Sequence, residues 1–154
     1  MYMETSAQNS IINQAYGFIV KEECEGLKIL LVEELDGEWS IPGGAVEEFD
    51  ESVKAGLQRE LEEELGLEHD DYSSKDMNIQ VSFIYDVPGG SRHGKTGVID
   101  MFLVILNEGV KPVAQKDHLK SLAWCTQEET KKKLVFDQHI ELIKKSIEYY
   151  QKSK

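Results

Sequence analysis

The sequence predicts an α/β fold in which helices flank a mixed β-sheet. The first observation is the order of its periodic segments, which reads strand, strand, helix, strands, helix. The second is a length of 154 residues, which suits one domain with one sizeable core. We therefore expect a single domain over residues 14–154. Residues 1–13 are polar and without periodicity, and we expect them to form a flexible N-terminal arm.

The first half of the chain is expected to open with a hairpin. Residues 15–20 and 28–33 are rich in apolar and β-branched side chains, and residues 22–26 between them form a turn. The Asp36-Gly37 pair predicts a second turn, because it tolerates positive φ angles. Residues 39–41 then form a short strand that ends at Pro42-Gly43-Gly44.

A helix is expected to begin at Glu51 or Ser52 and to end at Leu65. Either Ser52 or Asp50 could cap it, and Gly66 supplies the left-handed residue at its end. An apolar stripe along it (Val53, Leu57 and Leu61) would anchor it to the sheet.

The second half contributes the rest of the sheet and two helices. Residues 78–87 predict a strand, residues 88–97 a long glycine-rich loop, and residues 98–106 a buried central strand. Residues 121–125 form another short strand, and residues 126–129 open a short helix. Isoleucines at helical spacing predict the last helix over residues 137–151.

Composition excludes several classes of function. The formal net charge of -12 argues against binding a nucleic-acid polymer, which requires a basic surface. It does not exclude a small phosphorylated substrate, since bound cations reverse the local field. No apolar run is long enough to span a membrane and the N-terminus lacks a signal-peptide pattern, so we expect a cytoplasmic protein. Two cysteines are too few for a disulfide framework.

The helix over residues 51–65 carries an acidic face. At ~100° per residue, Glu60, Glu63 and Glu64 share one side of a single turn. Runs of glutamate are often only a solvated surface. However, like charges four residues apart destabilise a bare helix by a few tenths of a kcal/mol. A divalent cation would remove that repulsion, and hard carboxylate oxygens suit Mg²⁺ or Mn²⁺.

This region resembles the signature of the Nudix hydrolases: Gly, five residues, Glu, seven residues, then Arg-Glu-aliphatic-x-Glu-Glu-x-Gly-aliphatic. Glu51 is followed by seven residues and then by Arg59-Glu60-Leu61-Glu62-Glu63-Glu64-Leu65-Gly66-Leu67, and the typical Pro42-Gly43-Gly44 precedes it. One departure is that six residues separate Gly44 from Glu51. Either the loop carries an extra residue, or Asp50 replaces Glu51 and the helix register changes. We favour the loop insertion, because loops absorb a residue easily.

The resemblance implies a Nudix-type α/β/α sandwich and a metal site. Glu60, Glu63, Glu64 and the carbonyl of Gly44 would hold Mg²⁺ or Mn²⁺. A salt bridge between Glu51 and Arg59 would brace the junction of loop and helix. Glu63 is our expected general base, with Asp117 and Glu108 as alternatives. Dimers are frequent in the family, so a homodimer is one expected state.

The implied activity is metal-dependent hydrolysis of a pyrophosphate bond in a nucleoside diphosphate-linked substrate. Nucleoside triphosphates, dinucleoside polyphosphates and related compounds all contain this bond, and the motif does not choose among them. The alternative is a non-catalytic, nucleotide-binding Nudix-like module.

Two further features are candidates for substrate binding. Arg92 and Lys95, with His93 between them, place cations in the glycine-rich loop, where they could contact phosphate or simply form a solvated tip. Tyr85 lies eighteen residues after Leu67. A tyrosine near this distance is typical of Nudix enzymes that hydrolyse diadenosine polyphosphates, although tyrosine in a strand usually serves packing.

Overall fold

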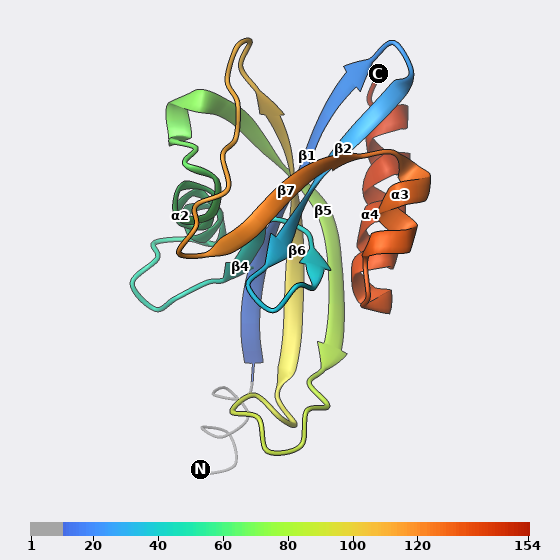
Figure 1. Ribbon diagram of the computed structural model, residues 1–154. Coiled ribbons are helices and arrows are strands. Elements are labelled where there is room, and N and C mark those ends of the chain that lie inside the picture. Colours follow the sequence, from blue (N-terminus) through green and yellow to red (C-terminus); the bar gives the residue numbers. More distant parts are fainter. Residues whose placement is uncertain (1–10) are drawn as a thin grey trace.

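The computed structural model describes residues 11–154, which form a mixed sheet with helices on both faces (Figure 1). Helix α2 covers one face, and α3 and α4 lie on the other side of the sheet. The strands are β1 (Ile11–Glu23), β2 (Gly26–Glu34), β3 (Trp39–Ser40), β4 (Gly43–Ala45), β5 (Tyr72–Ile84), β6 (Thr96–Leu106) and β7 (Leu119–Cys125). The helices are α2 (Val53–Leu65), the short 3₁₀ turn η1 (His69–Asp71), α3 (Gln127–Lys133) and α4 (Asp137–Lys152). The predicted α/β fold is therefore confirmed.

The sheet runs in the order β3-β2-β1-β6-β5, with β4 paired to β1 and β7 paired to β2. The pair β1–β6 is parallel, and the other strand pairs are antiparallel. Strand β6 lies between β1 and β5, as expected for the nearly continuous apolar run at residues 98–106. Such runs suit strands that are covered on both faces.

The N-terminal arm was expected over residues 1–13, but residues 11–13 belong to a strand. Strand β1 already begins at Ile11, where it pairs with Thr96, and Asn13 pairs with Val98. The polar composition of residues 1–10 was extended too far in the prediction, since Ile11 and Ile12 are apolar and belong to the strand. Residues 1–10 of the expected arm lie outside the described residues.

Two other strands differ from expectation. Strand β5 begins at Tyr72 instead of residue 78 and ends at Ile84. Asn78 sits at a register shift within it, with a φ of 56°, and its backbone N–H donates to the Asp76 carboxylate at 2.8 Å. Gly43 and Gly44, expected with Pro42 to end the preceding strand, instead form β4 together with Ala45 along β1. Both outcomes depend on partner strands and not on local sequence.

The helix boundaries follow the local signals closely. The hydroxyl of Ser52 accepts a hydrogen bond from Ala55 N at 3.0 Å, and Gly66 ends α2 with a φ of 65°. Thr126 and Glu129 form a capping box at the start of α3. No helix in residues 11–154 combines the length and apolarity that crossing a membrane requires.

Candidate active site

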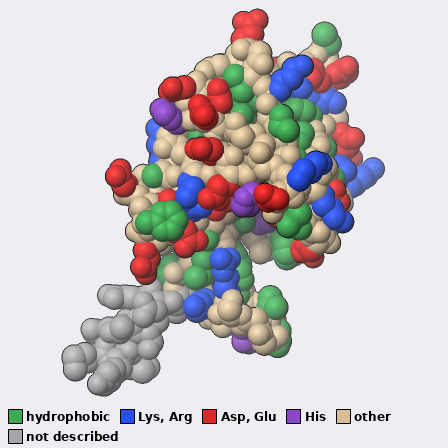
Figure 2. All heavy atoms as spheres, turned by 60° about the vertical axis from the view of Figure 1, so that its left-hand side comes forward, with side chains coloured by type: hydrophobic (Ala, Val, Ile, Leu, Met, Phe, Trp, Pro, Cys, Tyr) green, Lys and Arg blue, Asp and Glu red, His purple; other side chains and the backbone are tan. Residues whose placement is uncertain are grey.

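Helix α2 carries the predicted site and is held by its apolar side. Leu57, Leu61 and Leu65 are buried against the sheet face that includes Ala15 and Ile19 of β1. Because side chains three and four positions apart share a face, this packing directs the neighbouring acidic side toward β4. The expected anchoring stripe is thus present. Figure 2, which brings the α2 side of the molecule forward, shows acidic side chains gathered on that face.

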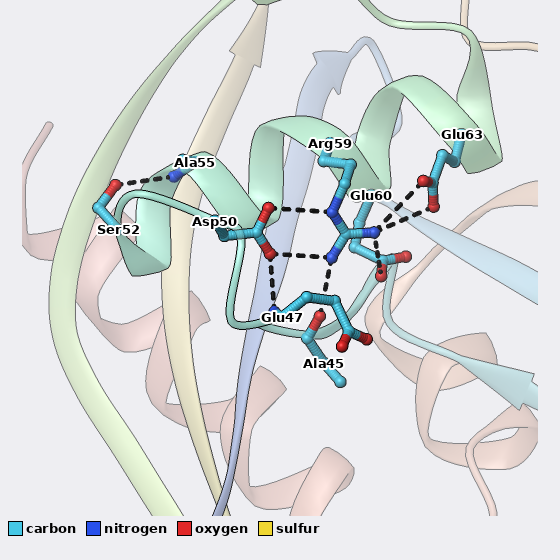
Figure 3. A network of polar contacts seen from close by, with 8 residues as sticks. All are labelled: Ala45, Glu47, Asp50, Ser52, Ala55, Arg59, Glu60 and Glu63. Carbon is cyan, nitrogen blue, oxygen red and sulfur yellow. Dashed lines mark hydrogen bonds and ion pairs between the residues drawn. The ribbon is translucent and has the colours of Figure 1, made fainter.

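Arg59 is the centre of a polar network between α2 and the preceding loop (Figure 3). Its Nε and Nη2 each donate to Asp50 at 3.0 Å, and Nη2 also donates to the carbonyl of Ala45 at 3.0 Å. Its Nη1 donates to Glu60 and Glu63 at 3.2 Å. One guanidinium therefore connects the loop to two carboxylates of the acidic face.

The expected salt bridge between Glu51 and Arg59 is wrong, and Asp50 takes that place. The Asp50 side chain is 5% exposed and also accepts a hydrogen bond from Glu47 N at 2.8 Å, whereas Glu51 is exposed. Hydrogen bonds from Arg59 hold the pKa of Asp50 below its usual value. Asp50 reaches Arg59 because its side chain turns back from the loop over the start of α2.

The extra residue is accommodated without a change of helix register. Five residues separate Gly44 from Asp50, as in the family signature, so the additional residue follows the acid rather than preceding it. Helix α2 begins only after Ser52, and an insertion at Glu51 therefore stays in the loop. Each alternative drawn from the sequence was right in part: Asp50 takes the place of Glu51, as the second stated, and the extra residue lies in the loop, as the first stated, but the expected change of helix register is wrong.

Glu60 and Glu64 lie against the two glycines of β4. A Cβ on Gly44 would come within 2.8 Å of the Glu60 carboxyl carbon, so any larger residue would displace this carboxylate from its position. The backbone N–H of Gly43 donates to Glu64 at 3.1 Å. Burial is the main cause that raises the pKa of Glu64 to about 9; nearby Glu60, Glu34 and Glu63 contribute in the same direction, and the hydrogen bond from Gly43 opposes them. Burial also raises the pKa of Glu60, with Arg59 opposing that shift.

The carboxylates of Glu60, Glu63 and Glu64 are the kind of oxygen ligands that suit a divalent cation. Within residues 11–154, no three His, Cys, Asp or Glu side chains are already arranged as a metal cluster. Arg59 holds Glu60 and Glu63, while Glu64 binds Gly43. Burial, with a smaller contribution from neighbouring carboxylates, raises the pKa values of Glu60 and Glu64, and a hard cation bound beside them would favour their ionised forms.

Sequence reasoning overlooked two nearby acids. Glu34, at the end of β2, raises the pKa of Glu64, and its carboxylate accepts a hydrogen bond from the Ser40 hydroxyl at 2.7 Å. Glu47 raises the pKa of Glu60. Neither has a distinctive sequence context, since each reaches the site through folding of the hairpin or loop. The alternative bases Glu108 and Asp117 are exposed and are not among the charges that shift Glu64.

The three residues predicted to bind substrate lie in the loop that follows β5. Tyr85 and Arg92 line a cavity of about 440 Å³, and Arg92 Nη1 lies 3.4 Å from the Tyr85 hydroxyl. Lys95 joins this turn through its backbone, whose carbonyl accepts from Tyr85 N at 2.9 Å. Of the three candidates, Tyr85 and Arg92 are therefore brought together, and the Lys95 side chain is not among those lining the cavity.

Comparison with known proteins gives a consistent result. A family model described as the NUDIX domain matches residues 14–145. A protein of Invertebrate iridescent virus 3, named as hydrolase 111R, is 50% identical over 46 residues, covering 30% of this chain. That match spans only 27% of the curated relative.

Solved structures share the fold at low sequence identity. An Ap4A hydrolase of C. elegans, in a binary complex, superposes with a TM-score of 0.75 at 18% identity, covering 91% of this chain and 98% of that one. The E. coli dihydroneopterin triphosphate pyrophosphohydrolase gives a TM-score of 0.71 at 17% identity, covering 86% and 92%. The NUDIX domain of Shewanella oneidensis NrtR, complexed with ADP ribose, gives 0.71 at 18%, covering 89% and 86%.

Proposed function

The chain belongs to the NUDIX domain family, and from this premise we propose that it hydrolyses the pyrophosphate bond of a nucleoside diphosphate linked to another group. The placement of Glu60 and Glu64 beside Gly43 and Gly44 carries the proposal. The buried Glu64 and the partly buried Glu60 have raised pKa values, and the positive charge of Mg²⁺ or Mn²⁺ would favour their ionised forms. The same cations would let a pyrophosphate approach a very acidic chain.

Glu60, Glu63, Glu64 and the carbonyl oxygen of Gly44 are the groups that would hold the cation. Bound there, Mg²⁺ or Mn²⁺ would neutralise the phosphate oxygens and leaving group and acidify the attacking water. Glu63 is the residue we assign to accept the water's proton. Its side chain is 41% exposed, so it can rotate away from Arg59 at little energetic cost.

Arg59 and Asp50 are assigned a positioning role. Their paired hydrogen bonds at 3.0 Å, together with the bond from Arg59 to the carbonyl of Ala45, fix the loop that follows Gly44. Holding that loop keeps the Gly44 carbonyl and the Glu60 carboxylate at a constant separation. Arg92, Lys95 and Tyr85 are assigned to the substrate, with Arg92 supplying positive charge for a phosphate.

The test is an assay of purified protein with Mg²⁺ or Mn²⁺. The panel comprises nucleoside triphosphates, dinucleoside polyphosphates, ADP-ribose and nucleotide sugars, with release of phosphate, pyrophosphate and nucleoside monophosphate measured. Glu63→Gln should lower kcat at least about 100-fold, the scale of a lost general base. Glu62→Gln is the matched control, because Glu62 is also exposed and lies on the same helix turn but outside the network.

Two results would contradict the proposal. Wild-type kcat in Glu63→Gln on every hydrolysed compound would remove Glu63 from the reaction. Binding of metal and nucleotide without any turnover would instead indicate a non-catalytic binding module.

A further inference from the structure

The sheet forks at one end, where its two parallel strands separate. Strands β1 and β6 pair with each other only as far as Ile19 and Val104. Beyond this point β1 pairs with β2, and β6 continues beside β5 to Leu106. Figure 1 shows the hairpin of β1 and β2 diverging from β5 and β6 at the upper end of the molecule. The carboxyl ends of β1 and β6 therefore no longer contact each other as strands.

A cavity of about 570 Å³ lies at this fork, and we call it the fork cavity. It is bordered by the ends of β1 and β6, the loop of residues 107–112, β7 and the end of α4. Trp124 in its wall packs with the core on the α2 side of the sheet, whereas Tyr150 packs with the core beneath α4. Within the described part of the chain, it shares no lining residue with the cavity beside Tyr85 or with the carboxylate site. Its volume suits a small molecule.

Backbone polar groups at both strand ends point into the fork. Along a strand, successive residues direct their N–H and C=O groups toward opposite neighbours. Gly17 N–H donates to the residue before β4, and Asn107 N–H donates to the residue before β5, so both face away from the β1–β6 pair. By alternation, Glu22 and Leu106 face the fork, beyond the last paired residues of β1 and β6. N–H groups at such a sheet edge can bind an anion.

The lining of the fork cavity is positively charged in a very acidic chain. Two lysines, Lys21 and Lys111, and one acid, Glu22, contribute to it. Glu22 is already paired with Lys154, so it does not neutralise the other two lysines. Lys21 lies 3.1 Å from Glu23, but these side chains are 42% and 38% exposed, and such a pair is weak in water. The formal charge of the whole chain is -12, so composition does not account for this lining.

Two aromatic rings line the same cavity, and each has a lysine ammonium group over it. Lys21 Nζ lies 4.3 Å from the centre of the Trp124 ring, and Lys154 Nζ lies 5.4 Å from the centre of the Tyr150 ring. Both rings are partly exposed. A ligand ring can pack against them, while the ammonium groups attract negative charge. The lining therefore suits a molecule that combines an aromatic ring with an anionic group.

We propose that the fork cavity is a second binding site, which takes a small aromatic carboxylate or phosphate. The ring of the ligand packs against Trp124 and Tyr150. Its anionic group lies near Lys21 and Lys111 and accepts hydrogen bonds from the backbone N–H groups at the fork. Carboxylates and phosphates share the negative charge and the acceptor oxygens that these groups recognise. The site is separate from the carboxylates of α2, so this inference does not depend on the proposed hydrolysis.

Trp124 makes binding at this cavity observable, because the chain contains only two tryptophans. In the Trp39→Phe variant, Trp124 is the sole source of tryptophan fluorescence. The probes are benzoate and phenyl phosphate, with benzyl alcohol as a ring without charge, and acetate and inorganic phosphate as anions without a ring. EDTA is present, so that no divalent cation draws phosphate to the acidic site.

At least one of the two aromatic anions should change the Trp124 emission in a saturable way. It should bind about tenfold more tightly than each of the three reference compounds, because a charge-assisted hydrogen bond and ring packing each contribute about that factor. The order of benzoate and phenyl phosphate identifies the preferred anion, and either order upholds the site.

Charge removal tests the role of the two lysines. In the Trp39→Phe background, Lys21→Gln and Lys111→Gln should each weaken binding of the aromatic anion about fivefold, the scale of one partly solvated charge. Lys120→Gln is the matched control, because Lys120 is an exposed lysine on the strand that carries Trp124 but does not line the cavity. It should stay within about twofold. Thermal denaturation confirms that each variant is folded.

Four results would overturn the inference. The first is an emission that neither aromatic anion changes in a saturable way. Equal affinity for benzyl alcohol would show that charge is not recognised, and equal affinity for acetate or inorganic phosphate would show that the ring is not. Binding that is unchanged in both Lys21→Gln and Lys111→Gln would place the ligand elsewhere. None of these results bears on whether pyrophosphates are hydrolysed.

Discussion

Replacing Asp50 with Ala should destabilise the protein strongly, whereas Glu51→Ala should have almost no effect. Asp50 accepts two hydrogen bonds from Arg59 at 3.0 Å and one from Glu47 N at 2.8 Å. Its side chain is 5% exposed and that of Arg59 is 20% exposed, so truncation leaves a largely buried guanidinium without its main partner. Glu51 is exposed. Comparing the two variants therefore distinguishes the observed ion pair between Asp50 and Arg59 from the expected pair between Glu51 and Arg59.

The magnitude follows from the burial of the pair. Removing one partner of a buried ion pair costs about 3–5 kcal/mol. Arg59 retains the Ala45 carbonyl, Glu60 and Glu63, which favours the lower end, about 3 kcal/mol. For a chain of this size each kcal/mol lowers Tm by about 2–4 °C, so Asp50→Ala should lose about 6–12 °C. Exposed Glu51→Ala should stay within about 0.5 kcal/mol of wild type.

The assay is urea and thermal denaturation of both variants at neutral pH. Because Arg59 lowers the pKa of Asp50, this stabilisation is complete above the unfolded pKa of about 3.9 and is lost as pH falls through the lower folded pKa. The gap between wild type and Asp50→Ala should therefore close in strong acid. A larger loss for Glu51→Ala than for Asp50→Ala would refute the assignment.

Three further predictions concern the carboxylate site and the loop. Burial raises the pKa of Glu64 to about 9, so metal-free folded protein keeps a proton that the unfolded chain releases near pH 4.5. Its stability in EDTA should fall between about pH 5 and 9, and Glu64→Gln should flatten that slope in urea titrations, whereas parallel curves would contradict the shift. Gly44→Ala should displace Glu60 and weaken Mn²⁺ binding about tenfold by EPR, and unchanged affinity would disprove the close approach. Arg92→Ala should raise KM about fivefold at constant kcat, and Lys95→Ala less, because only Arg92 lines the cavity; equal effects would count against that geometry.

Local sequence signals placed the acidic helix correctly. Ser52 and Gly66 bound α2 because caps depend on residues within one turn, and Glu60, Glu63 and Glu64 share a side because helical spacing is a local property. The signature added Arg59 and Gly44 to the same region. All of these residues lie within 25 positions of one another.

Tertiary structure decided the residues that meet from distant segments. Asp50 replaces Glu51 because the loop conformation determines which acid reaches Arg59: the count of five residues from Gly44 indicates Asp50, the count of seven residues to Arg59 indicates Glu51, and only the fold decides between them. Gln14, Tyr85 and His139 come from β1, the loop after β5, and α4, and no spacing along the chain relates them. Strand β4 exists only because β1 offers a partner for its backbone. A single chain reveals local periodicity, whereas side chains that meet across a sheet become neighbours only when the strands and helices have packed together.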